Sequence, residues 1–136
     1  MTDRSSSNNK NRSKKNRGYI LVAEDDKIYA NIYLNRLFKE GFEVKIAENG
    51  KETIEAVRKR IPDLILLDMI MPVKDGFWVL KELKADPQLK NIKVIALSNL
   101  SFDEDAEKIK GIGLTEYIVK SNLSIDKLIT KINSYF

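Results

Sequence analysis

Residues 64–68 read Leu-Ile-Leu-Leu-Asp, a short apolar run closed by an acid, and this run indicates the class of fold. Continuous apolar runs of this length are typical of strands covered on both faces in a parallel sheet. Pro62 ends the segment before it, and a similar run, Tyr19-Ile-Leu-Val-Ala23, lies near the start of the folded part of the chain. Two such strands indicate a sheet with helices on both sides.

Outward from this run, strand-like and helix-like segments alternate along the chain. We expect strands at 19–23, 42–47, 64–67, 94–97 and 116–119. We expect helices at 27–40, 51–60, 76–85 and 125–134, and one more that opens at the capping box Ser101-Phe-Asp-Glu104 and ends at Gly111 and Gly113. This (βα)5 alternation predicts an α/β fold, a doubly wound parallel five-stranded sheet with right-handed crossovers.

The helix expected at 27–40 has a simple apolar pattern. Its core-facing side is predicted from the spacing of Ile28, Ile32, Leu34, Leu37 and Phe38.

The net charge of +4 comes from the amino-terminal segment. Residues 1–17 hold six bases and one acid, and they contain no large apolar residue after Met1. The other 119 residues carry 18 bases and 19 acids, a net charge of −1. We therefore predict a disordered basic tail over 1–17 and one folded domain over 18–136, whose body is not basic.

Two residue types are absent, and both absences exclude classes of chemistry. The chain has no Cys and no His, which excludes disulfides, thiol nucleophiles, imidazole bases and His-ligated metals. No apolar run approaches the length of a membrane span, and the amino terminus lacks the apolar core of a secretory signal. A cytoplasmic protein without a membrane partner is expected.

Polar residues follow four of the five expected strands. They are Glu24, Asp25 and Asp26 after the first strand, Asp68 after the third, Ser98 after the fourth and Lys120 after the fifth. In a parallel sheet these positions meet at one edge, where ligands bind. Clustered carboxylates repel each other unless a cation neutralises them, and an all-oxygen ligand set favours a hard ion, Mg²⁺ or Mn²⁺.

Such an edge is suited to a phosphoryl group. A magnesium ion, the Lys120 amine and the Ser98 hydroxyl would together offset its charge. No general base is available, so the nucleophile should already be ionised, and Asp68 at the most central strand is the candidate.

Each of these residues also has an ordinary explanation. Asp26 is placed to cap the following helix, Lys120 alone would be a solvated loop residue, and Ser98 alone a turn residue. Their joint occurrence at several strand ends favours a site.

At these residues the sequence resembles the receiver domain of response regulators in two-component signalling, over about residues 18–135. The matching stretches are Ile20-Leu-Val-Ala-Glu-Asp-Asp26, Asp68-Met-Ile-Met-Pro-Val-Lys-Asp-Gly76, Ser98, and Tyr117-Ile-Val-Lys120. The resemblance implies a flavodoxin-like strand order of 2-1-3-4-5. It also implies a stand-alone signalling protein that is not an enzyme, apart from catalysing its own phosphorylation and dephosphorylation.

The resemblance also implies a role for each site residue. Asp68 would be the phosphoacceptor, with Mg²⁺ bound by Glu24, Asp25, Asp68 and the backbone carbonyl of Ile70. Lys120 and Ser98 would contact the phosphoryl oxygens, and Tyr117 would be the switch residue coupled to Ser98.

The implied partners are proteins. The donor would be a sensor histidine kinase or phosphotransfer protein, and a downstream protein target would dock on the face of the fourth helix, fifth strand and fifth helix.

Three positions depart from the family pattern. Ser121 follows Lys120 at a position where the family often has Pro, so the sequence does not decide whether the peptide between Lys120 and Ser121 is cis, as it often is in the family, or trans. Asn99 is bulkier than the usual residue at its position and narrows the access of phosphodonors to the site. Ile70 and Leu100 are apolar where polar residues can orient a water, which predicts slow self-dephosphorylation.

Three other functions fit the residues less well. An aspartyl phosphatase or phosphotransferase would need a carboxylate where Ile70 stands, and the glycine-rich loop of a dinucleotide-binding domain is missing after the first strand. Nucleic-acid binding is disfavoured because the body offers no basic helix, which leaves only weak, salt-dependent contact by the tail.

Overall fold

The computed structural model describes residues 17–99 and 116–136. The strands are β1 (Tyr19–Ala23), β2 (Glu43–Ala47), β3 (Leu64–Asp68), β4 (Lys93–Ser98) and β5 (Glu116–Val119). The helices are α2 (Lys27–Lys39), α3 (Gly50–Lys59), α4 (Gly76–Ala85) and α6 (Ile125–Asn133), with a short 3-10 turn, η1 (Lys120–Asn122). The five predicted strands are confirmed with ends that differ by one residue at most. The helix predicted from Ser101 to Gly113 lies outside the described residues, as does all of the predicted tail except Arg17.

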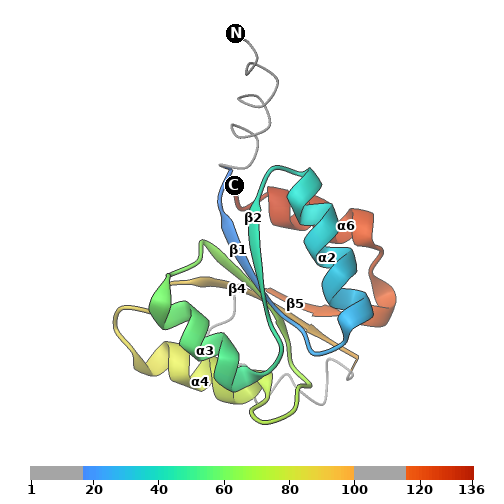
Figure 1. Cartoon of the computed structure of the whole chain (residues 1–136). Helices are drawn as coiled ribbons and strands as arrows, with labels where there is room; N and C mark the ends of the chain where they lie inside the picture. The colour runs from blue at the N-terminus through green and yellow to red at the C-terminus, as the bar shows by residue number, and fades with distance from the viewer. Residues whose placement is uncertain (1–16, 100–115) are drawn as a thin grey trace, which may run out of the picture.

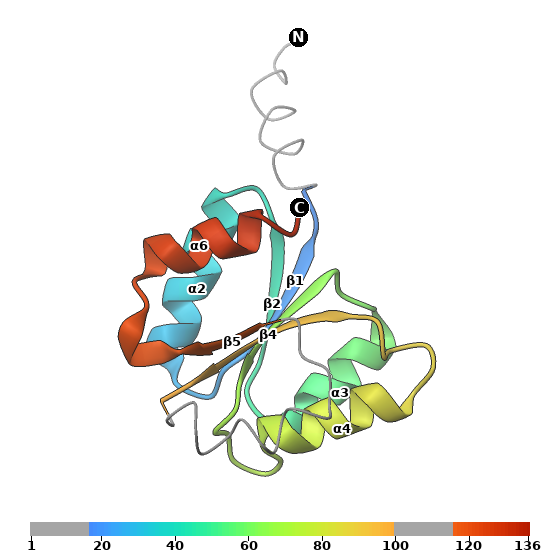
Figure 2. The ribbon, with the colours of Figure 1, turned by 180° about the vertical axis from the view of Figure 1, so that it is seen from behind.

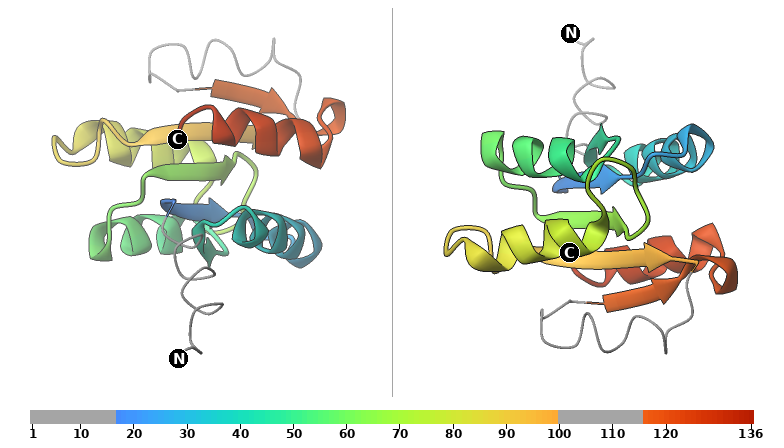
Figure 3. Two further views of the ribbon diagram at one scale, coloured as in Figure 1. Left: turned by 90° about the horizontal axis from the view of Figure 1, so that it is seen from above. Right: turned by 90° about the horizontal axis from the view of Figure 1, so that it is seen from below.

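All five strands are parallel and pair in the order β2-β1-β3-β4-β5, which confirms the predicted topology. Helices α2 and α6 cover one face of the sheet, and α3 and α4 cover the other (Figures 1 and 2). The views along the sheet show these three layers directly (Figure 3). No helix within 17–99 or 116–136 is both long and apolar enough to cross a membrane.

The core lies on both faces of the central strands. In β3, Leu64 and Leu66 pack into the cluster beneath α2 and α6, while Ile65 and Leu67 pack into the cluster beneath α3 and α4. Successive strand residues point to opposite faces, so covering both faces demands an unbroken apolar run.

The buried face of α2 differs from the prediction. Its buried residues are Ala30, Tyr33 and Leu37, which follow the i, i+3, i+7 spacing of a single helix face. Of the five predicted positions only Leu37 lies in that face, and Leu34 lies half-buried beside it. Three of the five are exposed: Ile28, Ile32 and Phe38. The prediction was wrong because it counted large aliphatic residues and overlooked that Ala30 and Tyr33 share the side of Leu37.

A backbone hydrogen bond joins the loop after β3 to the first residue of α3. The backbone N–H of Gly50 donates to the carbonyl oxygen of Lys74 at 2.8 Å, and a Cβ at Gly50 would collide with that carbonyl. Next to it, Val73 has a φ of 68°, a left-handed conformation that is rare for a β-branched residue. Lys74 N–H donates to Pro72 O at 2.8 Å and closes a tight three-residue turn around Val73.

The two ends of the described fold meet at the amino-terminal edge of the sheet. The ring of Phe136 packs against Gly18 and lies 4.7 Å, centre to centre, from the ring of Phe42. This edge is opposite the strand ends that carry the polar residues (Figure 1).

Candidate functional site

The carboxyl edge of the sheet gathers side chains from three strands. Glu24 and Asp25 follow β1, Asp68 is the last residue of β3, and Lys120 directly follows β5. The parallel pairing aligns these ends, since β3 pairs with both β1 and β4, and β4 pairs in turn with β5. The strand-end residues that the sequence singled out therefore do lie along one edge.

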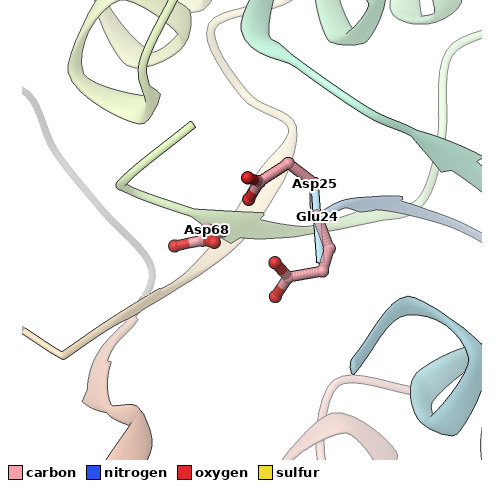
Figure 4. A group of neighbouring side chains, drawn as sticks. All are labelled: Glu24, Asp25 and Asp68. Carbon is pink, nitrogen blue, oxygen red and sulfur yellow. The ribbon is translucent and has the colours of Figure 1, made fainter. Parts of the chain in front are cut away.

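Glu24, Asp25 and Asp68 form a compact acidic cluster. Each offers a carboxylate oxygen, and these oxygens all lie within 4.8 Å of one another. Figure 4 shows the three carboxylates turned toward a common space beyond the ends of β1 and β3. Glu24 and Asp68 are buried, whereas Asp25 is exposed at the mouth of the cluster.

Lys120 supplies the countercharge. Its Nζ donates to Glu24 Oε1 at 2.7 Å and to Asp68 Oδ2 at 3.5 Å, and only 8 % of its side chain is exposed. Burial opposes the charge of this amine, but the hydrogen bond to Glu24 and the nearby Asp68 outweigh it, so the pKa of Lys120 is raised. The ammonium is therefore a permanent part of the site at neutral pH.

The pKa of Glu24 is raised as well, which for a carboxyl disfavours the charged form. Burial raises the pKa of its carboxyl to about 7; the Lys120 hydrogen bond works against this rise, and Asp68 adds to it. Two buried carboxylates, Glu24 and Asp68, share one ammonium, and a further cation would offset the remaining negative charge.

Backbone donors orient the two buried carboxylates. The N–H of Ile70 donates to Asp68 Oδ1 at 3.1 Å, and the N–H of Asp26 donates to Glu24 Oε2 at 3.1 Å. The second oxygen of Asp68 faces Lys120.

Asp26 does not belong to the cluster, because it caps α2. Its side chain accepts from the N–H groups of Ile28 at 2.8 Å and Tyr29 at 3.4 Å. The ordinary explanation of this residue is therefore confirmed.

The remaining predicted residues lie in or directly after β3, β4 and β5. Ser98 ends β4 and is fully buried, while Tyr117 in β5 is half-buried and packs against the cluster beneath α3 and α4. Ile70 carries an apolar, largely exposed side chain two positions after Asp68, and Asn99 is exposed. Leu100 lies outside the described residues.

One neighbour of the site was missed by the sequence analysis. The Nζ of Lys120 lies 4.4 Å from the centre of the Tyr29 ring in the first turn of α2. The available signal was an aromatic residue placed four positions after Asp25, where the first helix turn faces the carboxyl edge.

The model of the response regulator receiver domain family matches residues 20–133. The chain belongs to this family. The receiver domain is 33 % identical over 116 residues to the polar-differentiation response regulator DivK of Brucella anthropi, an alignment that covers 85 % of this chain and 94 % of that protein.

Solved structures agree with this assignment. The receiver domain of Francisella response regulator 1452 is 34 % identical, with a TM-score of 0.78 and coverage of 88 % of this chain and 96 % of that one. The response regulator TrrA from Thermotoga maritima is 30 % identical, with a TM-score of 0.75 over 87 % of this chain and 98 % of that one, and its structure is a complex with Mg²⁺ and a beryllium fluoride.

The acidic cluster of this receiver domain is chemically suited to magnesium. Its donors are carboxylate oxygens alone, which a hard divalent ion prefers. The peptide between Lys120 and Ser121 is trans, because the described residues contain no cis peptide bond, and η1 continues the chain from Lys120.

Proposed function

We propose that this receiver domain is a phosphoacceptor that takes a phosphoryl group onto Asp68 from a phosphohistidine of a sensor histidine kinase or phosphotransfer protein. One observation carries the proposal: the Lys120 ammonium lies between the buried Glu24 and Asp68 carboxylates and donates to Oδ2 of Asp68. A permanent cation beside an ionised carboxylate at a strand end fits an acceptor of a negatively charged group.

The transfer is an in-line displacement. An oxygen of the Asp68 carboxylate forms a new bond to phosphorus, the bond between phosphorus and the donor nitrogen breaks, and the electron pair of that bond stays on the imidazole. The hydrogen bond from the Ile70 N–H to Asp68 Oδ1 holds the carboxylate in one orientation during the approach. Lys120 offsets the charge of the incoming oxygens.

Magnesium would be held by Glu24, Asp25, Asp68 and the carbonyl oxygen of Ile70. When bound, it supplies charge neutralisation for the transferring group. Glu24 stays fixed through Asp26 and Lys120, and the exposed Asp25 lies at the open side of the site.

The phosphorylated domain would pass the signal on by binding a downstream protein. Ser98 would hydrogen-bond to a phosphoryl oxygen, and Tyr117 would turn inward with it, which biases the face of β5, α6 and the helix predicted at 101–113 toward a downstream target. In this proposal residues 18–136 form the receiver domain, residues 1–17 a basic tail, and the protein acts in the cytoplasm on no substrate but itself.

The direct test is incubation of the full chain with phosphoramidate and Mg²⁺, followed by intact mass measurement. Phosphoramidate replaces phosphohistidine: its P–N bond breaks and ammonia leaves. We expect the mass of one phosphoryl group to be added, and none in Asp68→Asn.

Asp75→Asn is the matched control. Asp75 lies in the same loop and caps α4 through the Trp78 N–H at 2.9 Å, a role that asparagine also performs. This variant should be phosphorylated normally. Equal phosphorylation of the wild type and Asp68→Asn, or none in the wild type even with a cognate kinase, would refute the proposal.

A further inference from the structure

Tyr29 is a third neighbour of the Lys120 ammonium, beside the two acids. The ammonium has three N–H donors, and the hydrogen bonds to Glu24 and Asp68 engage it from the β1 and β3 side. The Tyr29 ring lies 4.4 Å from Nζ, well within the range of a cation–π contact. Only 8 % of the lysine side chain is exposed.

The Tyr29 ring packs in turn against a second aromatic ring. Tyr29 stacks on Tyr33, with ring centres 6.1 Å apart and planes 28° apart. Tyr33 is buried in the cluster beneath α2 and α6, so the core fixes the surface against which Tyr29 rests. Asp26 fixes the first turn of α2, because it accepts the N–H of Tyr29 itself.

A cavity of about 170 Å³ lies beside Tyr29 and Lys120. Tyr29 and Lys120 both line it, together with the mostly apolar residues Ile32, Tyr33, Leu97, Leu123, Ser124, Ile125 and Leu128. A smaller, non-aromatic residue at position 29 would widen this cavity next to the lysine side chain. Water could then reach a charge that is now almost covered.

We infer that Tyr29 is a positioning residue for phosphotransfer, whose ring holds the Lys120 ammonium between Glu24 and Asp68 and keeps water from it. This inference rests on the proposed phosphoacceptor function. An aromatic face attracts an ammonium without fixing its direction, so Lys120 can shift from Glu24 toward phosphoryl oxygens on Asp68 while the contact persists. A third carboxylate in this place would attract Lys120 away from the phosphoryl group.

The test compares Tyr29→Leu, which removes the ring, with Tyr29→Phe, which keeps it. We expect the rate constant of phosphorylation by phosphoramidate to fall about three- to tenfold in Tyr29→Leu and to stay within about twofold of wild type in Tyr29→Phe. Phe38→Leu is the matched control, because it makes the same kind of change on an exposed aromatic residue at the far end of α2. It should leave the rate unchanged.

A double-mutant cycle separates positioning of Lys120 from a general effect on the fold. If Tyr29 acts through Lys120, Tyr29→Leu costs nothing further in a Lys120→Met background. The inference is overturned if the loss is the same in both backgrounds, if Tyr29→Phe loses as much as Tyr29→Leu, or if Tyr29→Leu has no effect.

A second measurement does not depend on phosphorylation. Acetylation of Lys120 by acetic anhydride, quantified by peptide mass spectrometry, should be several-fold faster in Tyr29→Leu than in wild type and Tyr29→Phe, while Lys131 reacts equally in all three. Unchanged Lys120 acetylation in Tyr29→Leu would contradict the shielding. If the wild type fails to accept a phosphoryl group, the proposed function fails, and acetylation still decides whether Tyr29 covers Lys120.

Discussion

Lys120 and Glu24, 96 positions apart in the sequence, form a 2.7 Å hydrogen bond in which both side chains are almost completely buried. The pair joins the end of β5 to the end of β1 across the intervening strands β3 and β4. A buried charge needs a partner, and each of these residues provides one for the other. The site therefore has a built-in countercharge when no metal is bound.

Asp25 should matter for metal affinity and hardly for folding. It is the exposed member of the acidic cluster, so Asp25→Asn removes a charge from the cluster without leaving a buried group unpaired. We expect Mg²⁺ affinity, measured by titration calorimetry, to fall by about tenfold or more. The urea midpoint without metal should be unchanged. Asp63→Asn, at the opposite edge of the sheet, should leave Mg²⁺ affinity unaltered; an Asp25→Asn variant with wild-type affinity would refute the ligand assignment.

Ile70 should slow loss of the phosphoryl group. Its apolar side chain cannot orient a water molecule for attack, whereas an asparagine amide can, and Ile70→Asn keeps the backbone N–H that donates to Asp68. We expect the decay of phosphorylated protein after donor removal, followed by intact mass, to accelerate at least about threefold. Ile61→Asn is the control, because Ile61 and Ile70 are both 54 % exposed. Decay of Ile70→Asn at the wild-type rate would count against this role.

Val73 should be replaceable with a gain in stability. Its φ of 68° disfavours a β-branched residue, and 69 % of the residue is exposed, so little burial is lost on substitution. Asparagine is less disfavoured at positive φ than valine is, and Val73→Asn should raise the free energy of unfolding, measured by urea denaturation, by about 1 kcal/mol. Val44→Asn is the comparison, because it makes the same change in the extended backbone of β2, and it should instead lower stability. A loss of stability in Val73→Asn would show that the turn is not strained.

Glu116 should stabilise the fold in a pH-dependent way. Its carboxylate accepts from Lys131 Nζ at 2.6 Å and from the Tyr135 hydroxyl at 2.8 Å. The Lys131 hydrogen bond lowers the pKa of Glu116, against the effect of burial. A carboxyl with a lowered pKa contributes stability above its unfolded pKa of about 4.3, and this contribution is lost as the pH falls through the folded value.

Glu116→Gln should accordingly be less stable than wild type by about 1 kcal/mol at pH 7 and equally stable near pH 3. Thermal denaturation at several pH values measures this difference. Glu55→Gln, an exposed position on α3, should show no such dependence. A difference that persists unchanged at pH 3 would mean that the Glu116 charge is not the cause.

There is a physical reason why the strands, and the end of the sheet that carries the candidate site, could be predicted from the sequence. A strand buried on both faces must be apolar throughout, so the runs at 19–23 and 64–67 were unambiguous, and parallel pairing then requires that Glu24, Asp25, Asp68 and Lys120 meet. Helix capping by Asp26 is equally local, since the donors lie two and three residues away.

What the sequence did not predict depends on tertiary contacts. Which face of α2 is buried is decided by its packing on the sheet, and Ile28, 72 % exposed, is as apolar as the buried Leu37. The contact between Tyr29 and Lys120 joins residues from opposite ends of the chain through their side-chain conformations. The positive φ of Val73 goes against the conformational preference of valine, and it occurs next to the backbone hydrogen bond that joins its loop to Gly50.

The contact between Gly18 and Phe136 has a consequence for how the chain could be rearranged. The first and last parts of the described fold are adjacent, and they lie at the edge opposite the acidic cluster. A short linker could join them, and the molecule could be reopened at an exposed loop as a circular permutant. In such a circular permutant, a partner could approach Asp68 as freely as it could in the protein with its natural chain order.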